Sequence, residues 1–179
     1  VSGPDGPVIA RDVVVALGPW SNDIFEPLGY DIPLFVKRGY HMHYKAAGNA
    51  TLSRTVIDAD TGFALAAMTK GIRMTTGAEF AHRDAAATPV QVDRCEPKAR
   101  ELFPLESRVE ATPWLGRRPC LPDMTPVMGP APRHPGLWFL FGHAHHGLTN
   151  AAVSGRLIAE MITGEETFCD ISGFRADRD

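Results

Sequence analysis

Residues 137–163 read LWFLFGHAHHGLTNAAVSGRLIAEMIT, and this stretch contains three elements in succession. Five apolar residues predict a buried strand over 137–141. Residues 142–147, GHAHHG, form a turn with glycine at both ends. Helical spacing then predicts a helix over 148–163 that ends at Gly164, with a buried stripe of Val153, Leu157, Ile158, Met161 and Ile162.

A glycine turn that leads into a helix suits the binding of a ligand. The first backbone N–H groups of the helix are unpaired, and the dipole of the helix is positive at that end. Both favour an anionic or electron-rich ligand edge above residues 142–147. The small residues 151, 152, 154 and 155 would also let another backbone approach the helix closely. The alternative interpretation is an ordinary buried helix.

The rest of the chain reads as short strands and helices. The run VVVAL predicts a central strand within residues 11–17, covered on both faces, and Ser21 is the expected cap of a short helix that ends at Gly29. Strands at 34–44, 55–59, 63–68 and 72–80 predict an antiparallel meander. A helix over 89–103 and strands at 108–112 and 137–141 complete the prediction, with a loop rich in Pro and Gly between the last two strands.

Composition excludes several classes of protein. The chain has 44% hydrophobic and 22% charged residues, which is typical of a globular protein. A net charge of -3 and scattered basic residues argue against nucleic-acid binding. Three widely spaced cysteines favour a reducing cytoplasm, and since no apolar run reaches the ~20 residues of a membrane span, any membrane attachment would be peripheral. The first residues lack Met and form a turn, which predicts a fragment.

Histidines and arginines are the candidate functional side chains. His143, His145 and His146 could suggest a metal site, but adjacent histidines in a turn rarely point to one centre, so no metal is expected. Arg117 and Arg118 lie in a rigid loop next to a proline, where a guanidinium is well placed to bind a carboxylate at two points. A surface arginine pair is the alternative.

Four stretches together resemble the D-amino-acid oxidase and dehydrogenase superfamily of FAD-dependent oxidoreductases. They are VVVALGPWS at 13–21, PLFVKRGYH at 33–41, RMTTGAE at 73–79, and WLGRRPCLPDMTPVMG at 114–129 followed by GLW at 136–138, Gly142-His143 and GLT at 147–149. The resemblance covers almost the whole chain, and the order and spacing of the stretches agree with it.

This resemblance implies an α+β fold, with an antiparallel substrate-domain sheet and the C-terminal part of an α/β FAD-binding domain. Residues 1–30 and 112–179 would belong to the FAD-binding domain, and residues 31–111 to the substrate domain. The glycine-rich phosphate loop of a dinucleotide-binding unit is absent from the chain. The expected partner is therefore the N-terminal half of the same protein, with self-association as a second way to cover apolar surface.

The implied reaction oxidises a D-amino acid to a 2-oxo acid and ammonia, with hydride transfer to FAD. Arg118 would anchor the substrate carboxylate. His145 or His146 would supply a weaker polar contact where some members of the family have an arginine. Tyr40 and His41 are weaker catalytic candidates, with core packing as the alternative. The expected cofactor contacts are Gly18, Gly116, Gly142, His143, Gly147, Leu148 and Thr149.

Several alternatives remain open at this stage. The leading hypothesis is a D-amino-acid dehydrogenase that passes electrons to a quinone or another carrier, in the cytoplasm or peripheral to the inner membrane. An oxidase of the glycine, sarcosine or D-proline type would use oxygen instead. A non-catalytic fragment and, ranked last, a metal-dependent hydrolase that uses the histidines are the remaining alternatives. The substrate, the electron acceptor and the oligomeric state are not decided by the sequence.

Overall fold

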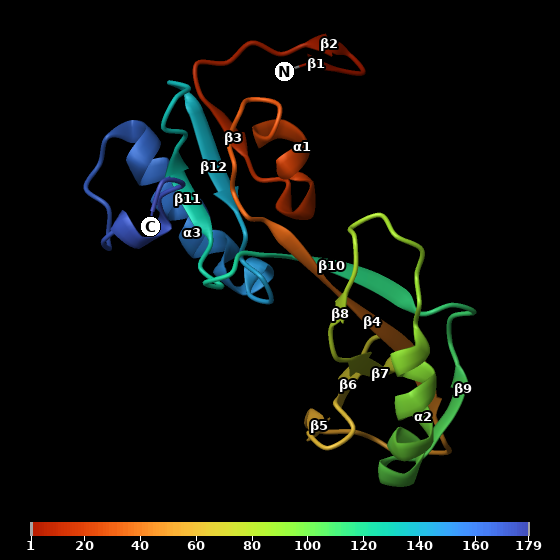
Figure 1. Cartoon of the computed structure of the whole chain (residues 1–179). Coiled ribbons are helices and arrows are strands. Elements are labelled where there is room, and N and C mark those ends of the chain that lie inside the picture. The colour runs from red at the N-terminus through yellow and green to blue at the C-terminus, as the bar shows by residue number, and fades with distance from the viewer. Residues whose placement is uncertain (1, 179) are drawn as a thin grey trace. The chain divides into compact units, whose positions relative to one another are not determined.

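The structure, a computed structural model, describes residues 2–178, which form two compact units (Figure 1). The first unit combines residues 2–36 with 118–178, and the second contains residues 37–117. Strands β4 (Phe35–Ala46) and β10 (Trp114–Cys120) carry the chain from one unit to the other. The domain division predicted from the sequence, after residues 30 and 111, lies a few residues before each of these boundaries.

A small mixed sheet forms the centre of the first unit. Its strand order is β11 (Val127–Pro130), β12 (Leu137–Phe141) and β3 (Val13–Val15), with β11 antiparallel and β3 parallel to β12. The apolar run at 137–141 is thus a strand, as predicted. Phe25 of α1 (Asn22–Phe25) stacks on Phe141 at 5.3 Å between ring centroids and, with Phe139, fills the core beside the sheet.

Helix α3 (Gly147–Thr163) follows β12 and ends as its sequence predicts. Gly164 adopts a φ of +75°, the left-handed conformation that glycine tolerates best at a helix end. Leu157 and Ile158 are buried against Met128. Val153 is 53% exposed, so its place in the predicted buried stripe is wrong, and Ser154 is buried instead.

Two predictions for the N-terminal part are corrected. Within residues 2–178, β3 pairs with β12 alone and Val14 is 37% exposed, so this strand is an edge strand and not a covered central one. Ser21 already has helical backbone angles and makes no side-chain capping bond, because the 3-10 turn η1 (Gly18–Trp20) runs directly into α1. The predicted first turn is present, between β1 (Ser2–Gly3) and β2 (Gly6–Pro7).

The second unit is built on the predicted antiparallel meander. The order β10-β4-β7-β6-β5 uses β7 (Gly71–Thr76), β6 (Phe63–Met68) and β5 (Val56–Asp58). Two short strands, β8 (Glu79–Phe80) and β9 (Leu105–Arg108), also pair with β4. The antiparallel sheet confirms the predicted fold class.

One helix, α2 (Val90–Leu102), covers one face of this sheet. Its buried residues Val92, Cys95 and Ala99 pack on the side chains that alternate along the strands. The helix ends at Leu102, one residue before the predicted end at Phe103. The core of the second unit contains Tyr40, Met42, Tyr44, Phe63, Leu65, Ile72, Met74 and Leu105.

The segment between α2 and β11 differs most from the prediction. The expected strand at 108–112 is β9, which lies earlier, at Leu105–Arg108. Residues 114–120, expected in a loop because of their Gly and Pro, form strand β10. Residues 114–120 form a strand because β10 pairs with β4, which is distant in the sequence, and no local sequence pattern predicts this strand.

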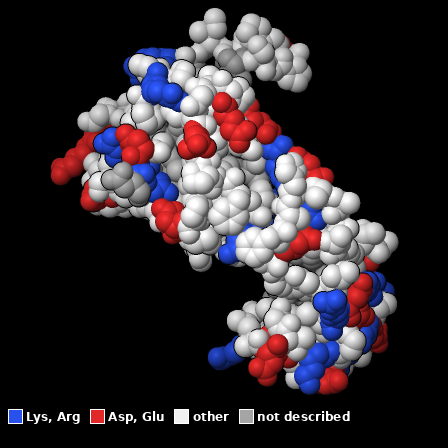
Figure 2. Space-filling view, in the orientation of Figure 1, with Lys and Arg blue, Asp and Glu red and all other residues white. Residues whose placement is uncertain are grey.

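Charged side chains of both signs are interspersed on the face shown in Figure 2. No single-sign patch is visible there. Among the helices of residues 2–178, none is long and apolar enough to cross a membrane. The last short helical turn of the described chain is η2 (Ser172–Phe174).

Candidate functional site

The glycine turn after β12 has a backbone that favours glycine at its first position, Gly142. Gly142 has a φ of +88°, and a Cβ atom there would lie 2.2 Å from Cδ1 of Leu121. Ala144 also adopts a positive φ, +49°, and its N–H donates to the carbonyl of Pro119 at 2.8 Å. Contacts to residues 119–121 therefore fix the path of the turn.

A cavity of about 270 Å³ lies beside this turn in the first unit. Four of the seven predicted cofactor contacts line it: Gly18, Gly142, His143 and Gly147. The rest of the lining is mostly small or apolar and consists of Ala16, Pro119, Leu140, Phe141, Ala144, Ala151 and Ser154. Walls of glycine and alanine leave room for a flat group to approach the backbone.

The first turn of α3 begins at this cavity. Within the helix, the first-turn amides of Gly147, Leu148 and Thr149 have no carbonyl partner, and all three residues are exposed. Leu148 is 94% exposed, which is unusual for a leucine. The positive end of the helix dipole adds to these donors. Together the amides and the small lining fit the electron-rich edge of a flavin ring.

The three histidines of the turn have different surroundings. His143 is half-buried, and its Nε2 lies 3.0 Å from the hydroxyl of Ser154. Burial lowers the pKa of His143, so its imidazole is neutral near pH 7. His145 and His146 are exposed. Among the described residues, no group of three or more His, Cys, Asp or Glu side chains could hold a metal ion.

Arg118 stands at the end of β10 that belongs to the first unit. The residue is half-buried, and its Nη1 atom is buried without a hydrogen-bond partner within residues 2–178. A buried guanidinium nitrogen with no acceptor is costly, and a bound carboxylate would relieve that cost. The neighbouring Arg117 does have a hydrogen-bond partner, because the Nε of Arg117 donates to the carbonyl of Arg83.

Two predicted site residues lie in the second unit, and packing accounts for both. A Cβ atom at Gly116 would lie 2.5 Å from the Trp114 ring, so the glycine makes room for that side chain. Tyr40 is 2% exposed, its hydroxyl donates to Glu79 at 2.9 Å, and it accepts from the backbone N–H of Thr88 at 2.8 Å. These surroundings favour the core-packing interpretation of Tyr40.

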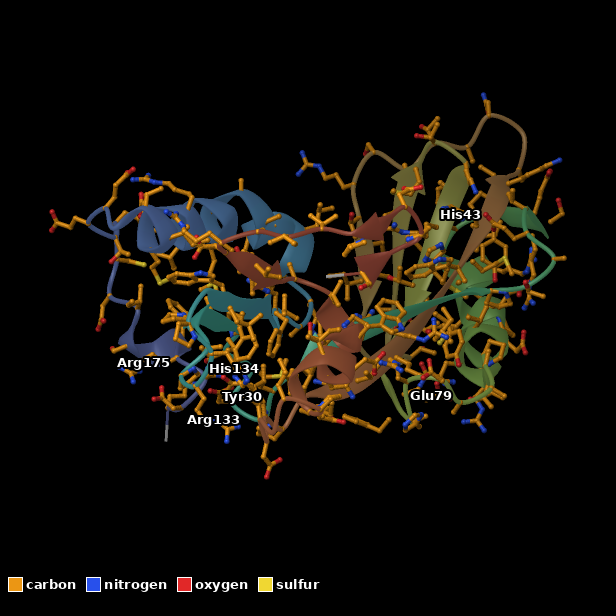
Figure 3. All side chains as sticks on the ribbon, turned by 90° about the horizontal axis from the view of Figure 1, so that it is seen from above. Tyr30, His43, Glu79, Arg133, His134 and Arg175 are labelled. Carbon is orange, nitrogen blue, oxygen red and sulfur yellow. The ribbon has the colours of Figure 1, made fainter. Side chains whose placement is uncertain are left out.

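A second cluster of the first unit is structural. The hydroxyl of Tyr30 lies 2.7 Å from Nδ1 of His134 and accepts the backbone N–H of Arg133, and the three labelled side chains lie together in Figure 3. The Arg133 guanidinium lies over the Tyr30 ring at 4.6 Å and donates to the carbonyl of Gly29. This network joins the β11–β12 turn to the end of α1.

Sequence reasoning missed several residues that the structure brings together. Ala16, Pro119 and Ser154 line the cavity, and their signal was a small residue or proline next to a predicted glycine. In the second unit the missed residue is His43, which shares one face of the sheet with Arg73 and with His41, a weaker candidate from the sequence. The signal there was the alternation His-Met-His on a strand.

A family model described as DAO, FAD dependent oxidoreductase, matches residues 2–161. A glycine oxidase of Pseudomonas putida is 32% identical over 171 residues, which are 95% of this chain and 46% of the relative. A D-amino acid dehydrogenase of Bradyrhizobium diazoefficiens is 32% identical over 176 residues, 97% of this chain and 41% of the relative. The chain thus spans less than half of the length of these relatives.

Solved structures show the same fold. A glycine oxidase from Geobacillus kaustophilus matches with a TM-score of 0.83 at 23% identity, over 98% of this chain and 48% of that chain. An iminodiacetate oxidase from Chelativorans sp. BNC1 matches with a TM-score of 0.80 at 24% identity, over 97% of this chain and 48% of that chain. At these identities the likeness concerns the fold alone.

Proposed function

The chain belongs to the family of FAD-dependent oxidoreductases, and on that premise we propose that it is the C-terminal part of a D-amino-acid dehydrogenase. The full protein would oxidise a D-amino acid to a 2-oxo acid and ammonia, and pass the electrons to a quinone or another carrier. The observation that carries this proposal is the small-residue cavity at the first turn of α3, which holds four of the predicted cofactor contacts.

In this proposal the backbone of the chain holds one edge of the cofactor. FAD, when bound, supplies the hydride acceptor. The amides of Gly147, Leu148 and Thr149 would donate to the electron-rich edge of the ring, and the helix dipole would stabilise negative charge there. Gly142 would let the ring approach closely, and Gly18 would border the adenosine side of the cofactor. The neutral imidazole of His143 would face the same cavity.

Arg118 would bind the carboxylate of the substrate. Its buried Nη1 lacks an acceptor within the described chain, which is the condition in which a carboxylate oxygen is bound most strongly. His145, exposed in the turn, would provide the second polar contact. Both residues orient the amino acid, and neither needs to move a proton.

An oxidase of the glycine, sarcosine or D-proline type is the second candidate. The observation in its favour is that the glycine oxidase and the D-amino acid dehydrogenase relatives are equally identical to this chain, at 32%. The two candidates differ in the electron acceptor and in the size of the substrate side chain.

The partner that we propose is the N-terminal half of the same protein. In the first unit Ile9 is 94% exposed, Leu17 50% and Trp20 47%. Within residues 2–178 the outer edge of β3 has no strand beside it. Exposed apolar side chains next to an unpaired strand edge favour coverage by further chain, or by a second copy of the protein.

The first experiment is a visible absorption spectrum of the full-length protein. Flavin bands that bleach on anaerobic addition of a D-amino acid, and return on addition of a quinone analogue but slowly with oxygen, would support the dehydrogenase. Bleaching by glycine and fast recovery with oxygen would favour the oxidase. A colourless protein that gains no bands with added FAD would contradict both.

Arg118→Leu tests the carboxylate anchor in the same preparation. Loss of a charged hydrogen bond should raise KM by about 10- to 100-fold and leave the flavin bands unchanged. Arg94→Leu is the matched control, because Arg94 is exposed on α2. An unchanged KM in Arg118→Leu would remove this residue from the site.

A further inference from the structure

The face of the second unit's sheet that points away from α2 carries an arginine, Arg73. On β7 the buried residues Ile72 and Met74 alternate with Arg73 and Thr75. In register, Arg73 lies between His43 of β4 and Ala66 of β6. Residues opposite each other on neighbouring strands share a face, so these three side chains form one row.

One nitrogen of the Arg73 guanidinium lacks a hydrogen-bond partner. Its Nε is buried, and within residues 2–178 it has no hydrogen-bond partner. The residue as a whole is half-buried. A donor that is shielded from water and unbonded destabilises the protein, and an acceptor on a bound ligand would relieve that cost.

The nearby carboxylate does not neutralise Arg73. The Glu110 carboxylate accepts hydrogen bonds from the ring Nδ1 of His43 at 2.9 Å and from the backbone N–H of His43 at 3.1 Å. The Nζ atom of Lys70 lies 3.7 Å from Oε1 of Glu110. Burial opposes ionisation of Glu110, but the bonds from His43 and the charge of Lys70 outweigh it and lower its pKa. Glu110 is thus ionised and already engaged by two other residues.

A flat aromatic wall lies beside this row. His41, two residues from His43 on the same face, stacks on Trp114 at 4.7 Å with 24° between the rings. Burial lowers the pKa of His41, and the charges of His43 and Arg73 lower it further, so the stacked imidazole is neutral near pH 7. Trp114 is 59% exposed, which leaves surface for another flat group.

We propose that this face of the sheet is a carboxylate-binding site. The Arg73 guanidinium binds the carboxylate, and the stack of Trp114 and His41 packs against an attached flat or apolar group. Ala64 and Ala66, opposite Thr75 and Arg73 in register, keep the neighbouring positions small. The ligand class is an apolar or aromatic carboxylic acid. If the proposed function holds, this acid can be the amino-acid substrate or its 2-oxo acid product.

Titration calorimetry of the full-length protein with benzoate tests this site without any need for turnover. The unchanged protein should bind benzoate, and Arg73→Met should weaken binding by about 10- to 100-fold, with Arg73→Lys in between. Arg94→Met, on exposed α2, should bind as the unchanged protein does. Equal binding by Arg73→Met, or no binding by the unchanged protein at millimolar benzoate, would overturn the inference.

Arg118→Leu separates this site from the anchor of the proposed function. If benzoate binding is lost in Arg118→Leu and kept in Arg73→Met, the inference is wrong and the proposed function stands. If binding is lost in Arg73→Met, the site is supported, whether or not the protein oxidises amino acids. A raised KM with unchanged kcat in Arg73→Met would identify the acid as the substrate, and an unchanged KM would identify it as a separate effector.

Trp114→Leu tests the aromatic wall. Loss of the ring should weaken benzoate binding by about 2- to 10-fold and leave the weaker binding of acetate unchanged, because acetate has no ring to stack. Equal loss for both acids would contradict a role for the stack.

Discussion

The two faces of the sheet in the second unit differ in how many hydrogen-bond partners they offer to an arginine. On the face covered by α2, Arg38 is fully buried and is bonded to Glu79, Tyr40 and backbone carbonyls of the loop at 82–86. On the other face, the buried Nε of Arg73 has no hydrogen-bond partner among the described residues. A charge that stabilises the fold is fully paired, whereas an unpaired one is available for a ligand.

The paired arginine also organises a loop. Arg38 Nε donates to Glu79 at 2.7 Å, and Nη2 donates to the carbonyl of Ala86 at 2.7 Å. The hydroxyl of Thr88 donates to the same Glu79 carboxylate. In Figure 3, Glu79 and His43 lie well apart within this unit, in keeping with their places on the two faces. The contrast between the faces can be tested by removing each partner in turn.

The largest effect is expected from Arg38→Met. Removing the guanidinium leaves the Glu79 carboxylate and several carbonyls without their donor, which should lower the free energy of unfolding by about 3–5 kcal/mol. Urea unfolding of the full-length protein measures this. Arg94→Met should stay within about 0.5 kcal/mol of the unchanged protein. A loss of less than about 1 kcal/mol for Arg38→Met would show that the covered face does not depend on the ion pair.

A smaller effect is expected from Tyr40→Phe. The change removes the donor to Glu79 and the acceptor for the N–H of Thr88, so the free energy of unfolding should fall by about 1–3 kcal/mol. Turnover of the folded protein, measured beside urea unfolding, separates the two interpretations of this residue. A fall in kcat without a loss of stability would favour the substrate contact that the sequence suggested.

The ion pair of Glu79 with Arg38 should make the free energy of unfolding depend on pH. Burial opposes ionisation of Glu79, but bonds from Thr88, Arg38 and Tyr40 and the Arg38 charge give it a pKa below its ordinary 4.5. A folded-state pKa below the unfolded one gives stability that is present above about pH 4.5 and is lost as the pH falls through the lower folded value. Unfolding measured from pH 7 to pH 3 should show a shallower decline in Glu79→Gln. Parallel curves would contradict this.

The smallest effect on stability is expected from Arg73→Met. Because Nε of Arg73 has no hydrogen-bond partner in the described chain, removal of the guanidinium should change the free energy of unfolding by no more than about 0.5 kcal/mol. Thermal unfolding of the variant beside Arg38→Met completes the comparison. Destabilisation as large as that of Arg38→Met would mean that Arg73 has a structural partner and is not available for a ligand.

Much of the fold and part of the site could be predicted from the sequence. Strand 137–141, the helix that ends at Gly164 and the meander are all set by patterns within a few residues, where periodicity and glycine placement act directly. Gly18, Gly142, His143 and Gly147 were chosen from the family resemblance, and the structure places them around one cavity. The role of these residues as cofactor contacts stays a prediction.

Tertiary structure alone decided the rest, since it depends on residues far apart in the chain. Residues 114–120 form a strand because β4 offers its edge to them, although their own Gly and Pro favour a loop. Arg38 is paired with Glu79, which lies 41 residues away in the chain. Glu110 is bonded to His43, and Nε of Arg73 has no acceptor among the described residues. The sequence shows which side chains can carry charge, but long-range packing determines which charges are compensated, because pairing depends on distances in space.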